Sequence, residues 1–394
     1  MGTVMTYYPQ TTNADGSVKV VLRSKIESTT CTDFTWICLS GDCGTNSVVG
    51  TSVYLDNTEP WCQTEEIMTR LVPSNAPFQL LLDGENWIDD IMNDITHWRA
   101  LTLVELRNRS DIGKANTSPQ TTTLPVVRVP SNCQRDFNLL AFDPDGDEVK
   151  CRYGNTLLSE CNPCTPPSVL SLSSACTLSF SPTSSMNEGP YAVQLVMEDF
   201  PWQTITLTQT DGGQTTITTD NAISKIPVQF VLQVDPVVPS CTDGLYLPKF
   251  LPPTPDNRAQ LYTSVNHTVE INIKAEANIS MITELLYSGL FDIKQTTLAA
   301  GEYILSWTAS QSDDGETQPI CFVVQAVSSS VKYHSELRCV IVIVVNVVAL
   351  SAKISSLSPL SEEYIKNTVI QQLKDELVRR GLPPIKHHSA DKES

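Results

Sequence analysis

The stretch that decides the fold is Phe142-Asp143-Pro144-Asp145-Gly146-Asp147-Glu148-Val149-Lys150-Cys151-Arg152-Tyr153. An acidic turn opens into a segment that alternates apolar and polar residues, which is the period of a half-buried β-strand. Residues 189–201, GPYAVQLVMEDFP, form a second strand-like run that ends in another acidic corner. The two runs together predict a β-sandwich of the extracellular kind, a class that mostly binds, spaces or polymerises.

Composition narrows the possible partners. The chain has 394 residues, 41% of them hydrophobic, and a formal net charge of −18. Phosphate binding needs a basic face, so the acidic balance argues against a nucleic-acid partner and against an anionic membrane surface. It permits Ca²⁺, which takes oxygen ligands.

The 12 cysteines predict disulfides and therefore an oxidising compartment. Cys161 and Cys164 have zinc-like spacing, but no second ligand pair follows at the distance a zinc site requires. Five cysteines between 126 and 238, and a lone Cys241 before the last pair, require one bridge across the boundary near residue 238. We expect six disulfides: Cys31–Cys62, Cys38–Cys43, Cys133–Cys241, Cys151–Cys161, Cys164–Cys176 and Cys321–Cys339.

Four Asn-x-Ser/Thr triplets support a secreted glycoprotein. We expect all four asparagines on exposed surface and at least two of them glycosylated: Asn108, Asn116, Asn266 and Asn278. The apolar run at 339–350, CVIVIVVNVVAL, is shorter than the roughly 20 residues a spanning helix needs. Its β-branched composition predicts a buried strand, so we expect no membrane span.

The predicted fold class is mainly β, with tandem Ig-like or cadherin-like β-sandwiches and a C-terminal strand–helix segment. Short strand-like runs separated by turn signals indicate the sandwiches. We expect an N-terminal disulfide-bonded β domain at 1–125, a cadherin-like sandwich at 126–238, an Ig-like sandwich at 239–346 and a tail at 347–394.

Local signals mark the borders of these ranges. Residues 4–8 and 17–24 flank an Asn-Ala-Asp-Gly turn and predict a hairpin. Residues 116–124 are polar and rich in Thr and Pro, which predicts a linker. Residues 203–219 predict a Thr-rich hairpin with little apolar surface, which could project as a ribbon. Trp61, Trp87 and Trp98 are core candidates.

The tail predicts a strand at 347–357 and an amphipathic helix at 361–381. The helix carries an apolar stripe at i, i+4 spacing, formed by Ile365, Val369, Leu373 and Leu377. One strand and one helix cannot close a core alone, so this stripe has to pack on the chain's own sandwiches or on a neighbouring subunit. We expect the second arrangement, an assembly joint between subunits.

The acidic turn is the best candidate for a site. Asp143, Asp145 and Asp147 alternate around a glycine and could converge on one Ca²⁺, joined by Glu198 and Asp199 if the two strands are neighbours. The alternative is a charged corner whose Asp side chains bind backbone N–H groups. No nucleophile elbow, zinc-protease motif, phosphate loop or dinucleotide fingerprint occurs, and oxidised cysteines leave no thiol nucleophile, so we expect no enzyme.

The runs FDPDGDEVKCRYG and GPYAVQLVMEDFP resemble cadherin-like sandwiches, in which acidic turns at domain ends bind Ca²⁺. Over nearly the whole chain, GTVMTYYP, CLSGDCG, RVPSNC, CTDGLYLPKFLPPTP, PICFVVQA and LKDELVRRGLP are similar to a family of secreted animal ectodomain proteins that is well represented in fish. This resemblance implies a secreted, disulfide-bonded protein of several sandwiches, and it implies no enzyme activity.

These observations predict a secreted structural or adhesive glycoprotein of the extracellular matrix that self-assembles into a filament by strand or tail exchange between subunits. Its partner would then be a second copy of itself. The alternative is a soluble or cell-surface binding module, a receptor ectodomain that recognises a glycan or a protein.

Overall fold

The computed structural model describes residues 2–28, 35–54, 62–85, 87–88, 90–290, 292–345 and 371–372. The chain divides into two compact units, Met1–Asn346 and Val347–Ser394. The described part consists of strands, loops and short 3₁₀ helices, which confirms the mainly β fold class. None of its helices is long and apolar enough to cross a membrane. The predicted tail strand, helix and apolar stripe lie outside the described residues, apart from Gln371 and Gln372.

The predicted N-terminal hairpin is present. Strands β1 (Gly2–Thr12) and β2 (Val18–Ser28) pair antiparallel, with Tyr7 opposite Leu22. The turn between them closes where the amide of Gly16 donates to the carbonyl of Asn13 at 3.0 Å. Gly16 has a φ of 86°, a conformation that glycine adopts without steric cost.

The largest sheet contains this hairpin and curls around a core. Its path runs β3-β6-β7-β17-β1-β2-β5-β4. The further strands are β3 (Ile37–Ser40), β4 (Thr45–Tyr54), β5 (Cys62–Val72), β6 (Phe78–Glu85), β7 (His97–Val104) and β17 (Lys225–Asp235). A short loop joins β3 to β4 although they end the path, so the sheet must bend back on itself. Trp87 and Trp98 are buried in the enclosed core, as predicted, and Trp61 lies outside the described residues.

Strand β17 joins the large sheet to a second sandwich. One of its edges pairs with β14 (Gly189–Phe200). Its other edge pairs in turn with β7, with β1 and, in parallel, with β9 (Val126–Pro130). Strand β11 (Glu148–Tyr153) completes this side beyond β14. Alternate residues of β17 therefore face two different cores, with Phe230 in one and Val231 in the other.

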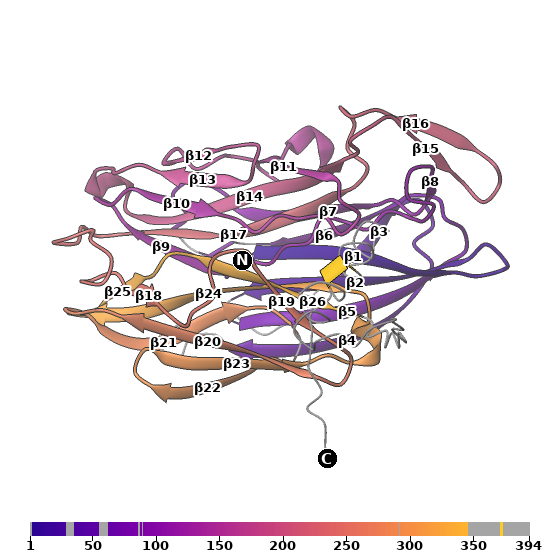
Figure 1. Ribbon diagram of the computed structural model, residues 1–394. Coiled ribbons are helices and arrows are strands. Elements are labelled where there is room, and N and C mark those ends of the chain that lie inside the picture. The colour runs from indigo at the N-terminus through magenta and orange to yellow at the C-terminus, as the bar shows by residue number, and fades with distance from the viewer. Residues whose placement is uncertain are drawn as a thin grey trace, which may run out of the picture. The chain divides into compact units, whose positions relative to one another are not determined.

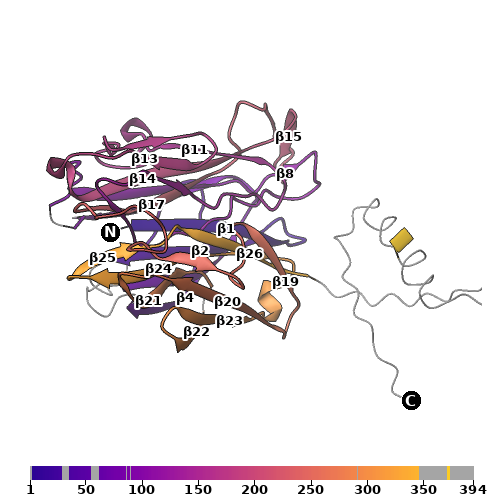
Figure 2. The same ribbon diagram turned by 60° about the vertical axis from the view of Figure 1, so that its left-hand side comes forward.

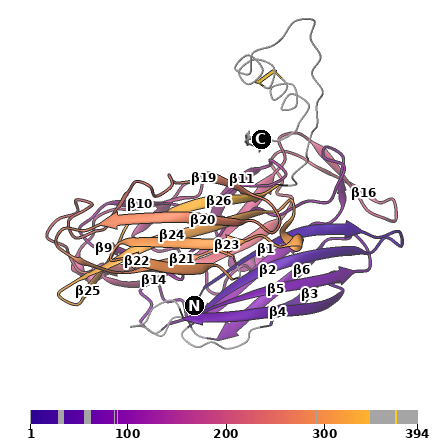
Figure 3. The ribbon, with the colours of Figure 1, turned by 60° about the horizontal axis from the view of Figure 1, so that its bottom comes forward.

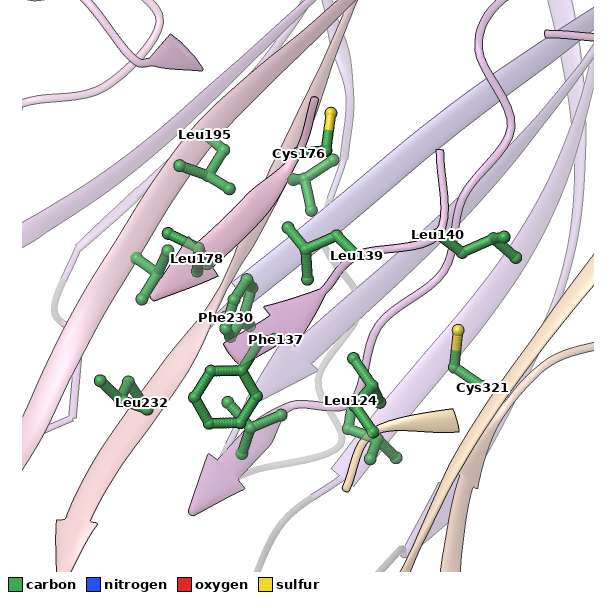
Figure 4. Close-up of a cluster of buried hydrophobic side chains, with 14 of the residues drawn as sticks. Leu124, Phe137, Leu139, Leu140, Cys176, Leu178, Leu195, Phe230, Leu232 and Cys321 are labelled. Carbon is green, nitrogen blue, oxygen red and sulfur yellow. The ribbon is translucent and has the colours of Figure 1, made fainter. Parts of the chain in front are cut away.

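A small sheet closes the second sandwich. It contains β10 (Arg135–Asn138), β12 (Leu170–Leu172) and β13 (Thr177–Phe180). Phe137 and Leu178 from this sheet pack against Leu195 of β14 and Phe230 of β17 (Figure 4). The connecting loops hold the 3₁₀ helices η1 (Thr156–Leu158) and η2 (Ser185–Asn187).

The third sandwich has two sheets with their own core. One contains β18 (Lys249–Leu251), β20 (Thr268–Glu276), β23 (Glu302–Thr308) and β22 (Lys294–Ala299). The other contains β19 (Ala259–Thr263), β26 (Arg338–Val344), β24 (Thr317–Ser328), β21 (Met281–Ser288) and β25 (Val331–His334), with helix η3 (Gln311–Asp313) before β24. In Figures 1 and 2 this sandwich lies on the side of β1 and β2 opposite to β11 and β14.

The Thr-rich hairpin is confirmed as β15 (Ile205–Thr208) and β16 (Gln214–Ile217). It does not stand free along its whole length, because β15 also pairs with β8 (Asn108–Arg109). Ile205 and Leu207 are buried with Ile223 in a small separate cluster. The hairpin therefore has an apolar anchor that the composition did not suggest.

The expected linker at 116–124 is instead an internal segment. Every residue from Asn116 to Leu124 is buried. Its polar groups are satisfied by distant partners, as where the amide of Tyr7 donates to Ser118 Oγ at 2.9 Å. Strands from 1–125 and from 126–238 also share one sheet, so these two ranges are joined across the predicted border rather than separated by it.

Three predicted disulfides are confirmed: Cys38–Cys43, Cys133–Cys241 and Cys321–Cys339. The predictions Cys151–Cys161 and Cys164–Cys176 are wrong, because the structure pairs Cys151 with Cys176 and Cys161 with Cys164. Cys151 on β11 and Cys176, which directly precedes β13 of the facing sheet, are buried in the same core, where they meet. The predicted Cys31–Cys62 bridge lies outside the described residues, and no described cysteine is free.

Removing two of these bridges should cost unequal amounts of stability. Cys133–Cys241 closes a loop with a sequence separation of 108, and Cys38–Cys43 one of 5. The chain-entropy relation gives about 5 kcal/mol for the long loop and about 2 kcal/mol for the short one. Chemical unfolding of the two Cys→Ser double variants measures the difference. Equal losses would contradict the role given to the long bridge.

Candidate functional site

The acidic turn folds around its first carboxylate. Asp143 Oδ1 accepts hydrogen bonds from the amides of Asp145 at 2.8 Å and Asp147 at 3.4 Å. The amide of Gly146 donates to the carbonyl of Asp143 at 3.1 Å, and Gly146 has a φ of 88°. These are the local bonds by which Asp stabilises turns, and they place the turn directly before β11.

A neighbouring strand brings a third carboxylate to this turn. Strands β11 and β14 are adjacent, with Val149 opposite Asp199. One carboxylate oxygen from each of Asp143, Asp147 and Asp199 lies within 4.8 Å of the others. Asp145 turns aside, because its carboxylate accepts from the amide of Thr117 at 2.6 Å and pairs with Lys114 at 2.6 Å.

Glu198 does not join the cluster, which corrects the predicted ligand set. Successive residues of a strand point to opposite faces, so Glu198 lies on the other side of the sheet from Asp199. Its carboxylate pairs there with Arg152 at 2.9 Å and with Lys225 at 3.1 Å.

A buried arginine lies inside the cluster. The Arg109 side chain is 1% exposed and forms paired contacts with the carboxylate of Asp147 and with that of Asp111. Arg109 Nη1 also donates to Asn116 Oδ1 at 2.5 Å. This role was not predicted from the sequence, because Arg109 is the middle residue of a glycosylation triplet and Asp147 comes from a distant segment.

Asn116 connects the arginine to the third carboxylate. Its Nδ2 donates to Asp199 Oδ2 at 2.7 Å. The other oxygen of Asp199 accepts from the amide of Ser224 at 2.8 Å and from its hydroxyl at 2.7 Å. The Tyr7 hydroxyl completes the network, because it accepts from Asn116 Nδ2 at 3.3 Å and from the amide of Glu105 at 3.1 Å. Sequence reasoning missed Tyr7 and Ser224 as well.

The cluster holds more negative charge than its cations balance. Burial, followed by the charges of Asp199, Asp145 and Asp147, raises the pKa of Asp143 to about 9. Burial also raises the pKa of Asp199 to about 7, against the hydrogen bonds from Asn116 and Ser224. At neutral pH the site therefore favours binding a proton or another cation.

The residues fit a calcium ion in part. Asp143 Oδ2 is buried and has no hydrogen-bond partner among the described residues, and carboxylate oxygens are the ligands Ca²⁺ prefers. Asp147 would have to share its carboxylate with Arg109. Calcium at Asp143, Asp147 and Asp199 remains a proposal, with a proton on Asp143 as the competing state.

A second feature is an open groove of about 420 Å³ beside β11. Its lining includes Arg152, Tyr153 and Lys225. The Arg152 guanidinium uses its donors in four hydrogen bonds to Glu160 and Glu198, and Lys225 forms an ion pair with Glu198 at 3.1 Å. The buried hydroxyl of Tyr153 has no partner among the described residues. The groove could take a small polar ligand.

No protein-family model matches the chain, and no curated protein matches it significantly. Among solved structures, 58% of the chain is similar to 99% of the N-terminal Ig1-2 module of the Drosophila receptor protein tyrosine phosphatase DLAR, at 12% identity and a TM-score of 0.23. Human protocadherin-24 EC1-2 matches 59% of the chain over 99% of its own, at 12% identity and a TM-score of 0.19. An endo-fucoidan hydrolase of glycoside hydrolase family 107 matches 80% of the chain but only 39% of its own, at 14% identity and a TM-score of 0.20. TM-scores this low carry no argument about function.

Three of the four predicted glycosylation sites are exposed, and one is not. Asn108, Asn266 and Asn278 lie on the surface, whereas Asn116 is fully buried, so its predicted exposure is wrong. Glycopeptide mapping of protein secreted from animal cells should find glycans on at least two of the exposed asparagines. A glycan on Asn116 would contradict the buried network described above.

The acidic cluster should make stability depend on pH and on calcium. The folded-state pKa of Asp143 is raised from 3.8 to about 9, so the stabilisation from its proton is complete below pH 4 and is lost as pH rises toward 9. In chelator, the melting temperature should fall across this window. Added Ca²⁺ should restore the melting temperature at pH 8, because it binds the folded state.

The substitution Asp143→Asn tests whether the cluster binds a proton or Ca²⁺. The amide keeps the oxygen that accepts from the turn and removes the charge, so the variant should melt higher than wild type in chelator at pH 8 and lose its response to Ca²⁺. Asp211→Asn, in an exposed hairpin turn, is the control and should change neither property. If added Ca²⁺ does not change the melting temperature of the wild type at pH 8, the calcium proposal fails and a proton on Asp143 is the state that remains.

Proposed function

We propose that the protein is an extracellular structural or adhesive module that assembles with copies of itself through its C-terminal segment. Its five disulfides among the described residues fit an extracellular protein. The observation that carries the proposal is the end of β26. Its pairing with β19 ends at Val344, and the amide of Val345 donates to the carbonyl of Thr263 at 2.8 Å, yet the uncharged run of the sequence continues to Leu350.

The described unit supports this proposal as a tightly connected building block. The third sandwich is tied to the second by Cys133–Cys241 and by apolar contacts that include Cys321 and Val323. It is tied to the first strands by the Tyr8 hydroxyl, which donates to the carbonyl of Thr317 at 2.6 Å. Such cross-links between distant segments would let a force applied at the tail pass through the whole unit.

The interface between β2 and the third sandwich also contains charge. Arg23 pairs with Asp313 at 3.0 Å and with Glu316 at 2.9 Å. Lys25 Nζ donates to Thr122 Oγ1 at 3.0 Å and to Ser288 Oγ at 3.1 Å. Buried pairs of this kind fix geometry more reliably than they add stability. They support a subunit whose parts keep a fixed arrangement.

A binding module is the second candidate, and the groove at Arg152, Tyr153 and Lys225 favours it. The groove is polar and open to solvent, and a glycan is a ligand of suitable chemistry. The two candidates differ in solution. A polymer subunit forms regular long species as concentration rises, whereas a receptor fragment stays small.

Deletion of residues 347–394 should abolish assembly and leave the described unit folded. The deleted segment contains the predicted stripe Ile365, Val369, Leu373 and Leu377, whose burial would contribute roughly 6–10 kcal/mol before ordering entropy is subtracted. Sedimentation velocity over a concentration series measures the assembled fraction.

A full-length variant with Ser at the four stripe positions is the matched control. It retains the apolar run at 339–350 and removes only the predicted helix contact. If the truncated chain assembles as the full chain does, the joint lies elsewhere and the proposal fails.

A further inference from the structure

Strand β4 is an edge of the largest sheet and has unusual properties for one. It pairs with β5 and with no other described strand. It has 10 residues, TNSVVGTSVY, and none of them is charged or proline. Figure 3 shows β4 at the outer margin of this sheet. An edge strand of this kind can accept a further strand, because its outward N–H and C=O groups have no ladder partner.

The other long edges of the described sheets carry protective charges. Strand β21 has 8 residues and contains Glu284, and β22 has 6 and begins with Lys294. Strand β11 contains Glu148, Lys150 and Arg152. Charged side chains on an edge discourage pairing with another chain. Strand β4 is thus the longest described edge and lacks the usual protection.

The side chains of β4 leave both of its faces open. Every residue from Thr45 to Gly50 is exposed, with Val48 at 48% and Val49 at 62%. Successive residues point to opposite faces, so neither face is covered over this stretch. The following strand differs, because Gln63 and Thr64 of β5 are buried.

The start of β4 is held in place before any partner arrives. The Cys38–Cys43 bridge closes the loop between β3 and β4. Gly44 has a φ of 63°, and a Cβ there would lie 2.0 Å from the carbonyl oxygen of Leu71. The chain therefore approaches β5 more closely than a side chain would allow. A fixed edge loses little entropy when a strand is added.

We propose that the edge of β4 that no described strand covers receives residues 346–350 of a second copy of this chain as an added strand. The inference rests on the proposed function and names the acceptor of its joint. The donor sequence NVVAL contains no charge, and it begins after Val345, whose amide donates to the carbonyl of Thr263 in its own unit at 2.8 Å. Two chains of net charge −18 repel each other, so contact is least costly where neither side is charged.

The lengths of donor and acceptor agree. The five donor residues span about 17 Å as a strand, which fits within the six exposed residues 45–50 of β4. Main-chain pairing with an edge supplies affinity without a preformed pocket.

The test is a charge placed on the edge of the full-length protein. Val49→Lys should raise the concentration needed for assembly by about tenfold or more, equivalent to about 1.4 kcal/mol. Leu71→Lys adds the same charge on β5, which is 47% exposed at that residue but is not an edge. Leu157→Lys adds it far from any edge, at 93% exposure. Both controls should assemble like wild type.

Cross-linking identifies the donor even if a lysine variant folds poorly. Chains with Val49→Cys and chains with Val347→Cys are mixed, and a disulfide dimer on a non-reducing gel is expected only in the mixture. Bridging within a chain that carries both substitutions, without bridging between chains, overturns the assignment to a second copy. Wild-type assembly with an unaffected Val49→Lys variant overturns the β4 edge alone, whereas a wild type that never assembles overturns the proposed function itself.

Discussion

The described unit depends on the main chain of β17. Its ten-residue pairing with β14 forms one wall of the second sandwich, and its contacts with β7, β1 and β9 join it to the N-terminal strands. Because neighbouring residues face opposite sides, Phe230 and Val231 belong to different cores. One buried strand therefore fixes the register of segments more than 200 residues apart, such as Thr3 opposite Gln229.

The acidic cluster is positioned by this arrangement. Tyr7 comes from β1, Asp199 from β14 and Ser224 from the residue before β17, so the network forms only when the strands are in register. A buried polar network that is fully satisfied favours one arrangement, and one that is partly satisfied is costly. Here Arg109 balances part of the negative charge. Asp143 Oδ2, which has no hydrogen-bond partner among the described residues, is the unsatisfied part of the network.

The alternation of apolar and polar residues and the odd number of cysteines on each side of the boundary predicted the features that depend on local sequence. They placed the strand Glu148–Tyr153 correctly and required a bridge from Cys241 across the boundary, which the structure forms with Cys133. These patterns gave wrong predictions where contacts with residues distant in sequence determine burial or disulfide pairing. The polar segment 116–124 is buried because strands far away in sequence satisfy it, and Cys151 pairs with Cys176 because both face one core. Arg109 was missed because its contact with Asp147 joins segments 38 residues apart, which no local pattern indicates.

A tightly cross-linked unit with an unprotected edge and an uncharged run after its last strand is suited to repeat along a line, since a head-to-tail contact that does not close gives a filament. Electron microscopy of the full-length protein across a concentration series tests this most directly. The account predicts regular filaments whose repeat is one unit long. Single particles of uniform size at every concentration would contradict it.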